Sequence, residues 1–475
     1  MIRTAWGLLW GASVAVCCTG CGTGVPTLVL PGEITDPVDT ERFELIARFV
    51  HLSDTHLVDE QSPGRLAEFA ELSGSAWRPQ EAYSTQLLDG MIRTVNKLHV
   101  ARMRIDFLIH TGDATDNAQL NELKWFVSVL DGGLINPLTG PDDRDPSQVP
   151  DPLLDPHHSF VAQGLYRNGV HGPAPTIPWY SVLGNHDQFA LGVFPIVTDV
   201  FGQRTSPLPL RNRIGLFFPV RLDPAGSEVW GPITPANPGP PPALNFPTFV
   251  PPNPERRYIT DRDFVDAHLN SVGEPPGHGF SEQSPDQTWY SVSPAPGLRL
   301  IALNTGSPIF EMPTFVYSEG AISLRQLSFL RRELEMAQAH NEWVIVATHH
   351  PSDSLNPAYG TALAPRSFRQ LLNEYPCVKL HLCGHTHRHE TIDRGGYAEI
   401  VTGSIIDAPQ QARVVELWRA KVGEGIELRY RMITHLEEIA PPDESQRDLF
   451  ADPLLPMRRR AAELAGAASL ADNSH

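Results

Sequence analysis

The segment Val378-Lys379-Leu380-His381-Leu382-Cys383-Gly384-His385-Thr386-His387 joins an apolar, strand-like run to a polar cluster. The same arrangement, an apolar run followed at once by Asp, Asn or His, occurs four more times. The other clusters are Asp54-Thr55-His56, Gly112-Asp113, Gly184-Asn185-His186-Asp187 and His349-His350, after apolar runs at residues 47–52, 105–109, 179–183 and 343–347. In open sheets, ligands gather at the carboxyl ends of strands, so the pattern predicts one metal site built from five loops.

Between and beyond these clusters the chain alternates between helical and extended patterns. Apolar residues recur at helical spacing over four segments, residues 78–99, 117–130, 323–340 and 365–375. Further strands are expected at residues 289–292, 298–304, 398–401, 413–418 and 426–432, and a short helix near 457–465. The alternation predicts an α/β domain over residues 43–435, followed by a C-terminal tail at 436–475.

A long interruption, over about residues 189–286, follows the third cluster. Its proline density over residues 232–254 excludes a helix or an inner strand there, and we expect the insertion to be irregular. Two interpretations remain open: a lid or specificity loop at the functional rim, or a surface excursion without a role.

The first 22 residues have the pattern of an export signal. Arg3 precedes an apolar run from Ala5 to Val16, which is too short to span a bilayer but suits a signal-peptide core. The following cysteines resemble a bacterial lipoprotein processing site with Cys21 as the acylated residue, and plain secretion is the alternative. We therefore expect an exported protein, periplasmic or held in the bacterial envelope by this lipid alone, with residues 23–42 as a flexible tether.

The charge balance excludes some partners. The chain has 55 acidic against 37 basic residues and a formal net charge of −18. Nucleic acid and anionic membranes need clustered positive charge, so neither is expected as the main partner. Bound divalent cations would reverse the local field at a site, which leaves a small phosphorylated substrate open.

The side chains in the clusters are typical of a particular group of metals. Asp54 and His56 alternate just past a strand, so both can face one ion from a short loop. Asp113 follows a glycine that lets the backbone approach closely, and Asn185 offers a neutral carbonyl oxygen. Carboxylate, amide and imidazole ligands without a thiolate suit Zn²⁺, Mn²⁺ or Fe.

The full set, Asp-x-His, Gly-Asp, Gly-Asn-His-Asp, Val-x-x-His and Gly-His-x-His in this order, resembles the calcineurin-like metallophosphoesterase superfamily. Every signature position is filled. The resemblance implies a four-layer αββα sandwich, in which two mixed β-sheets are flanked by helices and carry long loop insertions. It also implies a hydrolase acting on phosphoric ester bonds with two divalent metal ions.

Carried over position by position, the resemblance assigns each ligand to an ion. The ligands of one ion would be Asp54, His56 and His387, those of the other would be Asn185, His349 and His385, and Asp113 would bridge them. The segment Val346-Ala347-Thr348-His349 matches the Val-x-x-His signature, which selects His349 over the adjacent His350.

The remaining histidine of the third cluster, His186, would then serve catalysis, by donating a proton to the leaving oxygen or stabilising its charge. Such a histidine needs a partner that fixes its tautomer. The resemblance implies that Asp116, three residues after Asp113, takes this role. Purple acid phosphatases carry a ligating tyrosine at that position, so a purple iron centre is not expected.

The implied reaction is hydrolysis of phosphomonoesters or phosphodiesters by a water or hydroxide that bridges the two metal ions. The alternative is a non-catalytic metal-binding interaction module on the same fold. Such a module should have lost a ligand or His186, and this sequence keeps them all.

Overall fold

The computed structural model describes fourteen segments of the chain. These are residues 28–33, 38–65, 77–101, 103–140, 154–198, 202, 204–211, 217–222, 224–225, 229–231, 248–306, 318–357, 363–423 and 425–466. The expected export signal, with Cys21, lies outside them.

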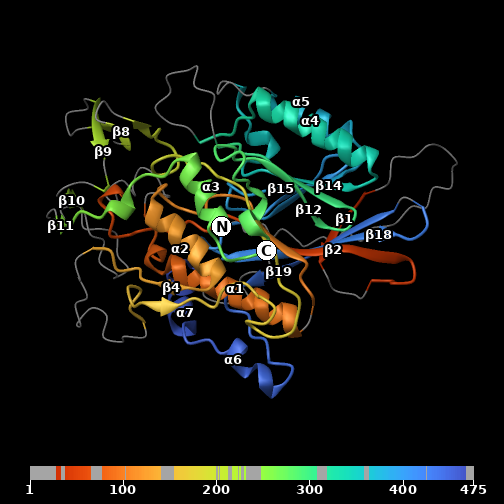
Figure 1. The fold of residues 1–475 in the computed structure, drawn as a ribbon, viewed down its shortest axis with the longest axis horizontal. Helices are drawn as coiled ribbons and strands as arrows, with labels where there is room; N and C mark the ends of the chain where they lie inside the picture. Colours follow the sequence, from red (N-terminus) through yellow and green to blue (C-terminus); the bar gives the residue numbers. More distant parts are fainter. Residues whose placement is uncertain are drawn as a thin grey trace, which may run out of the picture.

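Two six-stranded mixed sheets form the centre of the molecule (Figure 1). The first has the order β1 (Leu28–Glu33), β19 (Ile426–Thr434), β18 (Gln411–Ala420), β2 (Phe43–Leu52), β3 (Phe107–His110) and β6 (Trp179–Ser181). The second has the order β12 (Tyr290–Ala295), β13 (Leu298–Ala302), β14 (Trp343–Ala347), β15 (Val378–Cys383), β17 (Ala398–Val401) and β16 (Glu390–Asp393). Strands β2, β3 and β6 run parallel to one another, as do β13, β14, β15 and β17.

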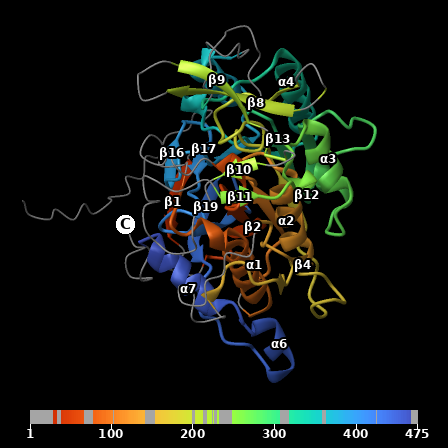
Figure 2. The same cartoon turned by 90° about the vertical axis from the view of Figure 1, so that its left-hand side faces the viewer.

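Helices cover the outer face of each sheet, on opposite sides of the molecule (Figures 1 and 2). On the first sheet lie α1 (Ser84–Ala101), α2 (Leu120–Asp131) and α7 (Leu455–Leu464), and on the second lie α4 (Leu324–Ala339) and α5 (Pro365–Asn373). This arrangement confirms the predicted αββα sandwich of two mixed sheets.

The sandwich follows from the alternation of side chains along each strand. In β2, Phe49 packs between the sheets, whereas its neighbour Val50 packs under α1. In β14, Ile345 faces the other sheet, whereas Val344 and Val346 face α4 and α5. Because successive side chains point to opposite faces, an inner strand covered on both faces is apolar throughout.

The predicted strands and helices occur close to their expected bounds. The five apolar runs that precede the clusters correspond to β2, β3, β6, β14 and β15. Each of these strands ends within five residues of its polar cluster, so the five clusters emerge at the carboxyl ends of strands in both sheets. The five clusters are neighbours because of the order of the strands in the sheets, not because of their order along the chain.

Three segments differ from the sequence-based expectation. Within the expected tether, β1 pairs in parallel with the edge strand β19, because backbone hydrogen bonds suffice to extend a sheet edge. Within the expected irregular insertion lies α3 (Asp261–Leu269), which begins with a capping box formed by Thr260 and Asp263. The expected tail contains α6 (Arg447–Phe450) in addition to α7, which corresponds to the short helix predicted there, and the segment buries Leu449, Leu454, Met457 and Ala461 against α1.

The insertion also contains short paired strands at the periphery. These are β7 (Val197–Thr198), β8 (Arg204–Arg211) and β9 (Phe217–Leu222) in one sheet, and β10 (Val229–Gly231) with β11 (Thr248–Val250) in another. A two-stranded pair of β4 (Leu134–Ile135) and β5 (Phe160–Val161) lies beside α2. Among the described residues, no helix is long and apolar enough to cross a membrane.

Candidate metal centre

The loops that carry the clusters are tied together by backbone hydrogen bonds. Asp54 N donates to Gly112 O at 3.0 Å, and His56 N donates to Asp113 O at 2.9 Å. Across the two sheets, His385 N donates to both carboxylate oxygens of Asp54 at 3.0 and 3.1 Å. These contacts hold loops from distant parts of the chain at fixed positions around one point.

Three ligand atoms of the first predicted set converge. The Nε2 atoms of His56 and His387 lie 3.0 Å apart, and Asp54 Oδ1 lies 3.9 and 3.4 Å from them. Two ligands of one zinc-like ion, each at about 2.1 Å, are separated by about 3.0–3.4 Å. Two of the three separations lie in this range and the third is 3.9 Å, so the three atoms surround a position that a single cation can occupy.

The positions of the Nδ1 protons of His56 and His387 also favour a cation between the two rings. Both Nδ1 atoms donate to carboxylates, His56 to Asp116 at 2.9 Å and His387 to Asp407 at 2.6 Å. Each neutral ring then presents a lone pair at Nε2, and two lone pairs 3.0 Å apart need a positive charge between them. In the metal-free protein a proton meets this need: burial opposes it, but Asp407 and Asp54 raise the pKa of His387 to about 10.

The Asp113 carboxylate lies between the two predicted ligand sets. Its Oδ2 is 3.6 Å from His56 Nε2 and 3.1 Å from His349 Nε2. Burial opposes protonation of His349, yet the carboxylates of Asp113 and Asp54 raise its pKa to about 9 in the metal-free protein. A carboxylate that approaches an imidazole of each set has the position of a bridging ligand.

A buried polar atom without a partner marks the second ligand set. Asn185 Nδ2 donates to Gly192 O at 2.9 Å, and this leaves its Oδ1 buried without a hydrogen-bond partner among the described residues. His349 Nδ1 donates to Thr111 O at 2.8 Å, so the ring turns Nε2 toward Asp113 Oδ2 at 3.1 Å. Buried polar atoms normally have partners, so the free Oδ1 of Asn185 fits a residue that binds a metal.

His349 and His350 both lie near His385, and their ligand atoms fall within 4.8 Å of one another. The two neighbours differ in what they approach. His350 Nδ1 is 2.8 Å from Thr305 Oγ1, and its Nε2 is buried without a hydrogen bond. Of these two neighbours, His349 lies at ion-pair distance from Asp113 (3.1 Å), and this geometry favours His349 as the ligand nearer the bridging carboxylate.

The backbone at the clusters is strained. Five of the seven predicted ligands have φ in the left-handed region: Asp54 (51°), His56 (43°), Asp113 (55°), His385 (71°) and His387 (56°). Side chains with a Cβ rarely adopt this conformation, and such residues concentrate at functional sites. This left-handed backbone conformation lets successive side chains of a very short loop point toward the same position.

Glycines of the clusters leave room for the ligands. A Cβ on Gly184 would lie 2.0 Å from Asp113 Oδ1, and a Cβ on Gly384 would lie 2.3 Å from Asp54 Oδ2. These positions require glycine because the ligand carboxylate occupies the space of the missing side chain.

His186 and Asp116 meet in a way that the sequence did not predict. His186 Nδ1 donates to the main-chain oxygen of Asp116 at 2.6 Å, whereas it lies 3.7 Å from the Asp116 carboxylate. The carboxylate instead accepts from His56 Nδ1 and pairs with Arg65 and Arg78 at 3.1 Å each. Asp116 thus contacts both histidines, one through its backbone and one through its side chain.

Asp187 ties the third cluster to the second. Its carboxylate accepts from the backbone nitrogens of Gly184, Thr115 and Ala114, at 2.8, 2.9 and 3.3 Å. Burial and the charge of Asp113 raise the pKa of Asp187 to about 6. Both oxygens of this carboxylate are therefore engaged by backbone nitrogens of the second and third clusters.

A pocket of about 350 Å³ opens over the centre. Its lining includes five of the residues singled out in the sequence, Asp113, Asn185, His186, His385 and His387. It also includes Arg78 and Asp407, which sequence reasoning missed because neither belongs to a motif or follows a strand in a cluster. The pocket therefore brings together the predicted ligands and two further charged groups.

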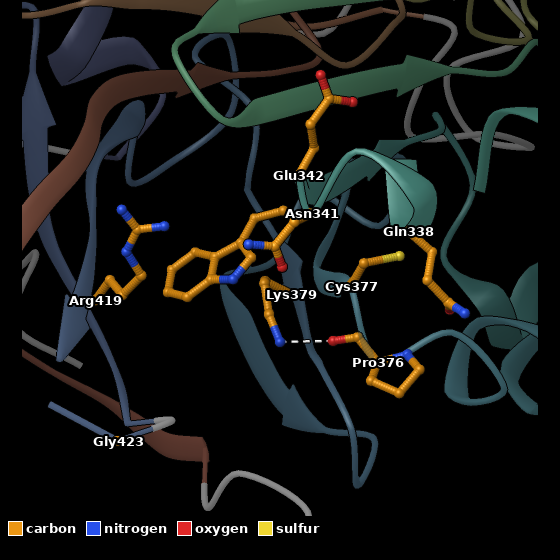
Figure 3. Close-up of a pocket in the computed structure, with 9 residues that line it drawn as sticks. Gln338, Asn341, Glu342, Pro376, Cys377, Lys379, Arg419 and Gly423 are labelled. Carbon is orange, nitrogen blue, oxygen red and sulfur yellow. Dashed lines mark hydrogen bonds between the residues drawn. The ribbon is translucent and has the colours of Figure 1, made fainter. Parts of the chain in front are cut away.

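A second cavity, of about 440 Å³, lies away from the clusters, at the amino ends of β14 and β15 (Figure 3). Lys379 Nζ donates to Pro376 O at 2.6 Å and, like Arg419, lies over the Trp343 ring. The lining of this second cavity contains no predicted ligand, and its two cations, Lys379 and Arg419, already have partners. We therefore place the functional site at the smaller pocket.

Two buried histidines inside the strands, His51 and His381, have ordinary partners. His51 is hydrogen-bonded to Thr111 and Thr402, and His381 to Thr348 and Glu399. Cys383 donates to Ile400 O at 3.6 Å, and both described cysteines are free. The cluster of His381, Cys383 and Glu399 is therefore satisfied without a metal.

Comparison with known proteins gives one strong match. The sequence model of the calcineurin-like phosphoesterase family matches residues 47–273 and 278–389, which include every predicted ligand and His186. A search of curated proteins gives no match.

Solved structures resemble the chain at low identity. A dimetal phosphatase from Danio rerio is 13% identical, with 82% of this chain and 100% of that chain covered and a TM-score of 0.41. GAP50, the anchor in the inner membrane complex of Plasmodium, is 12% identical (86% and 96% covered, TM-score 0.30). The sulfate thiohydrolase SoxB of Thermus thermophilus is 13% identical (87% and 61% covered, TM-score 0.31).

Proposed function

Because the chain belongs to the calcineurin-like phosphoesterase family, whose members are metal-dependent phosphoesterases, we propose that it hydrolyses phosphomonoesters or phosphodiesters of a small substrate. One observation carries the proposal: the side chains of all five clusters converge at one end of the two sheets, beside a pocket of about 350 Å³. A substrate in this pocket would meet the ligands and His186 together.

Two cations would be held by the residues described above. Asp54, His56 and His387 would bind one ion, Asn185, His349 and His385 would bind the other, and Asp113 would contact both. When bound, two divalent ions such as Mn²⁺, Zn²⁺ or Fe²⁺ supply a water of lowered pKa and positive charge for the phosphoryl oxygens.

The protein's own groups would orient the ester. Asn185 contributes a neutral oxygen whose direction is set by the hydrogen bond from Nδ2 to Gly192. Arg78 lines the pocket with a guanidinium that is 5% exposed and remains charged, because Asp407 and Asp116 raise its pKa against the effect of burial. The site would accept an anionic group even though the whole chain carries a net charge of −18.

His186 would transfer the proton to the leaving oxygen. Its Nδ1 proton is held by the Asp116 carbonyl, so a second proton on the protonated ring would sit on Nε2. From there it would pass to the oxygen of the departing alcohol. This role separates His186 from the ligands, since its loss should slow the reaction without removing a cation.

The partners and location follow from the sequence alone and remain proposals. We propose a small phosphorylated substrate, no nucleic acid, and export through residues 1–22, with membrane attachment only through lipidated Cys21. A non-catalytic metal-binding module is the less favoured function, because such a protein has no need for the pocket-lining His186.

The test is hydrolysis of p-nitrophenyl phosphate and bis-p-nitrophenyl phosphate by protein without residues 1–22. The reaction would be run with Mn²⁺, Zn²⁺ or Fe²⁺ beside Asp113→Ala, His186→Ala and an exposed control, Asp393→Ala. We expect metal-dependent turnover that both site variants lose and the control keeps. Absence of turnover with every metal, in a protein that binds two ions per chain, would favour the binding module.

A further inference from the structure

Asp407 lies in a network of hydrogen bonds and ion pairs, although it belongs to none of the sequence motifs. It follows β17 in a loop where Ser404 Oγ donates to Asp54 O at 2.6 Å. Gln80 Nε2 donates to Ile406 O at 2.8 Å and to Asp407 Oδ1 at 3.3 Å. The loop is thereby fixed both to the first ligand cluster and to the segment before α1.

Arg78 joins Asp407 to Asp116. Its Nε lies 3.0 and 3.1 Å from the two Asp407 oxygens, and its Nη1 lies 3.1 Å from Asp116 Oδ1. Its backbone nitrogen donates to Glu81 at 2.7 Å, and Glu81 also pairs with Arg65. The guanidinium is therefore held from both ends and cannot turn away from either carboxylate.

These contacts form a continuous chain from His387 through Asp407, Arg78 and Asp116 to His56. Its two ends are histidines whose Nε2 atoms lie 3.0 Å apart. Carboxylates that accept the N–H on the other ring nitrogen of a ligating histidine fix its tautomer and orientation, and their loss weakens metal binding. Here one arginine sets the positions of both carboxylates.

We propose that Asp407 and Arg78 are positioning residues of the metal centre. Asp407 orients His387, and Arg78 locks Asp407 and Asp116 together so that His56 and His387 present Nε2 to the same cation. The inference rests on the proposed binding of a cation by these histidines. It assigns no contact between Asp407 and the reacting ester.

The chemistry of arginine explains why this residue joins the two carboxylates. A planar guanidinium offers donors in several fixed directions, whereas an ammonium is a compact point charge on a flexible stem. A lysine at position 78 would satisfy one carboxylate at a time. We therefore expect Arg78→Lys to keep the charge but lose the alignment of the two histidines.

The test measures metal affinity directly. Full-length wild-type protein, Asp407→Asn and Arg78→Lys would be stripped with a chelator and titrated with Zn²⁺ by calorimetry, with bound metal counted by elemental analysis. Asp452→Asn is the matched control, because Asp452 also pairs with two basic residues, Lys97 and Arg458, but lines a different cavity whose lining contains none of the cluster residues.

We expect the dissociation constant of one bound equivalent to rise by about 10–100-fold in Asp407→Asn, with a smaller rise in Arg78→Lys and none in the control. The absorption spectrum of the Co²⁺-loaded protein should change in the same two variants. Melting temperatures of the metal-free proteins separate this effect from simple destabilisation. Wild-type dissociation constants and spectra in both variants would overturn the proposal.

The outcomes also separate this proposal from the proposed function. Wild-type protein that binds metal but hydrolyses no ester would contradict the phosphoesterase, while a raised dissociation constant in Asp407→Asn would still support the positioning role. Unchanged metal binding in Asp407→Asn, in a protein that hydrolyses esters, would contradict the positioning role alone.

Discussion

The Nε2 atoms of His56 and His387 lie 3.0 Å apart, although 331 positions separate the two residues in the chain. One follows β2 of the first sheet and the other follows β15 of the second. Their Nδ1 protons are engaged by different carboxylates, so the two lone pairs are directed at each other. The stability of this arrangement therefore depends on a positive charge between the rings, supplied by a proton or by a metal ion.

Removal of metal should consequently destabilise the protein. Ions that bind only the folded state add stability by mass action, about 4 kcal/mol when the free ion exceeds its dissociation constant 1,000-fold. We expect a chelator to lower the melting temperature of the wild type, and added Mn²⁺ or Zn²⁺ to restore it in a concentration-dependent way. In Asp113→Ala the shift should be much smaller, and an equal shift in both proteins would contradict a site that includes Asp113.

Gly192→Ala should impair the catalytic histidine. Its Cβ would lie 2.1 Å from His186 Nε2, and φ at this position is 70°. Because the ring must move, we expect kcat to fall at least 10-fold, which corresponds to a rise of about 1.4 kcal/mol in activation free energy. Gly169→Ala is the control, since it has φ of 77° but nothing within 4 Å. Equal activity in the two variants would contradict the expected effect of contact with His186.

Gly184→Ala should disturb the bridging carboxylate. The added Cβ would lie 2.0 Å from Asp113 Oδ1 and 2.4 Å from Asp113 N, which leaves no direction in which it could be accommodated. We expect loss of bound metal, counted by elemental analysis, together with loss of turnover. Gly133→Ala is the comparison, because its nearest neighbour would be 3.7 Å away. Full metal content in Gly184→Ala would contradict the placement of Asp113.

Acid should weaken the packing of α3 on the edge strand β6. His268 and His278 both contact the Trp179 ring, and burial lowers their pKa values to about 3 and about 4. The unfolded chain binds these protons below about pH 6.5 and the folded chain does not, so stability falls as pH drops from about 6.5 toward 4. The groups around His268 are Phe264, Phe280, Trp179 and His278, none of them an acid that would favour the charged ring.

His268→Phe tests this pH dependence. A phenyl ring fills the same space and cannot be protonated, so the variant should lose less stability than the wild type between pH 7 and pH 5. The readout is the denaturant midpoint at each pH, taken as the difference between the two proteins in the presence of chelator. A parallel decline in both would contradict the assignment to His268.

The C-terminal helix should contribute to global stability. Met457 is 4% exposed and packs in the core cluster under α1. Met457→Ala should cost about 2–5 kcal/mol of unfolding free energy, measured by denaturant titration. Arg459, with a side chain 58% exposed, gives the control Arg459→Ala, for which we expect less than about 0.5 kcal/mol. A change in Met457→Ala no larger than in the control would mean that α7 packs only loosely.

Much of the fold could be predicted from local patterns. Strands such as Trp343–Ala347 are short, apolar and followed by a polar cluster, and each appears close to its predicted bounds. The missed elements had weaker signals. The α3 helix has few apolar residues and lies in a proline-rich region, although its Thr-x-x-Asp capping box was visible in the sequence. The strand β1 depends on pairing with β19, a partner that only the folded sheet provides.

The amino-acid sequence is enough to show which groups are available as ligands and that they follow strands. Residue type and strand end are local properties, and parallel strands bring their carboxyl ends together without further information. The tertiary structure decided what each ligand contacts on its far side. His56 meets Asp116, His387 meets Asp407, and Arg78 joins the two acids, because loops distant in sequence fold against the same end of the sheets. Such contacts have no spacing or periodicity along the chain, so only the packed structure could reveal them.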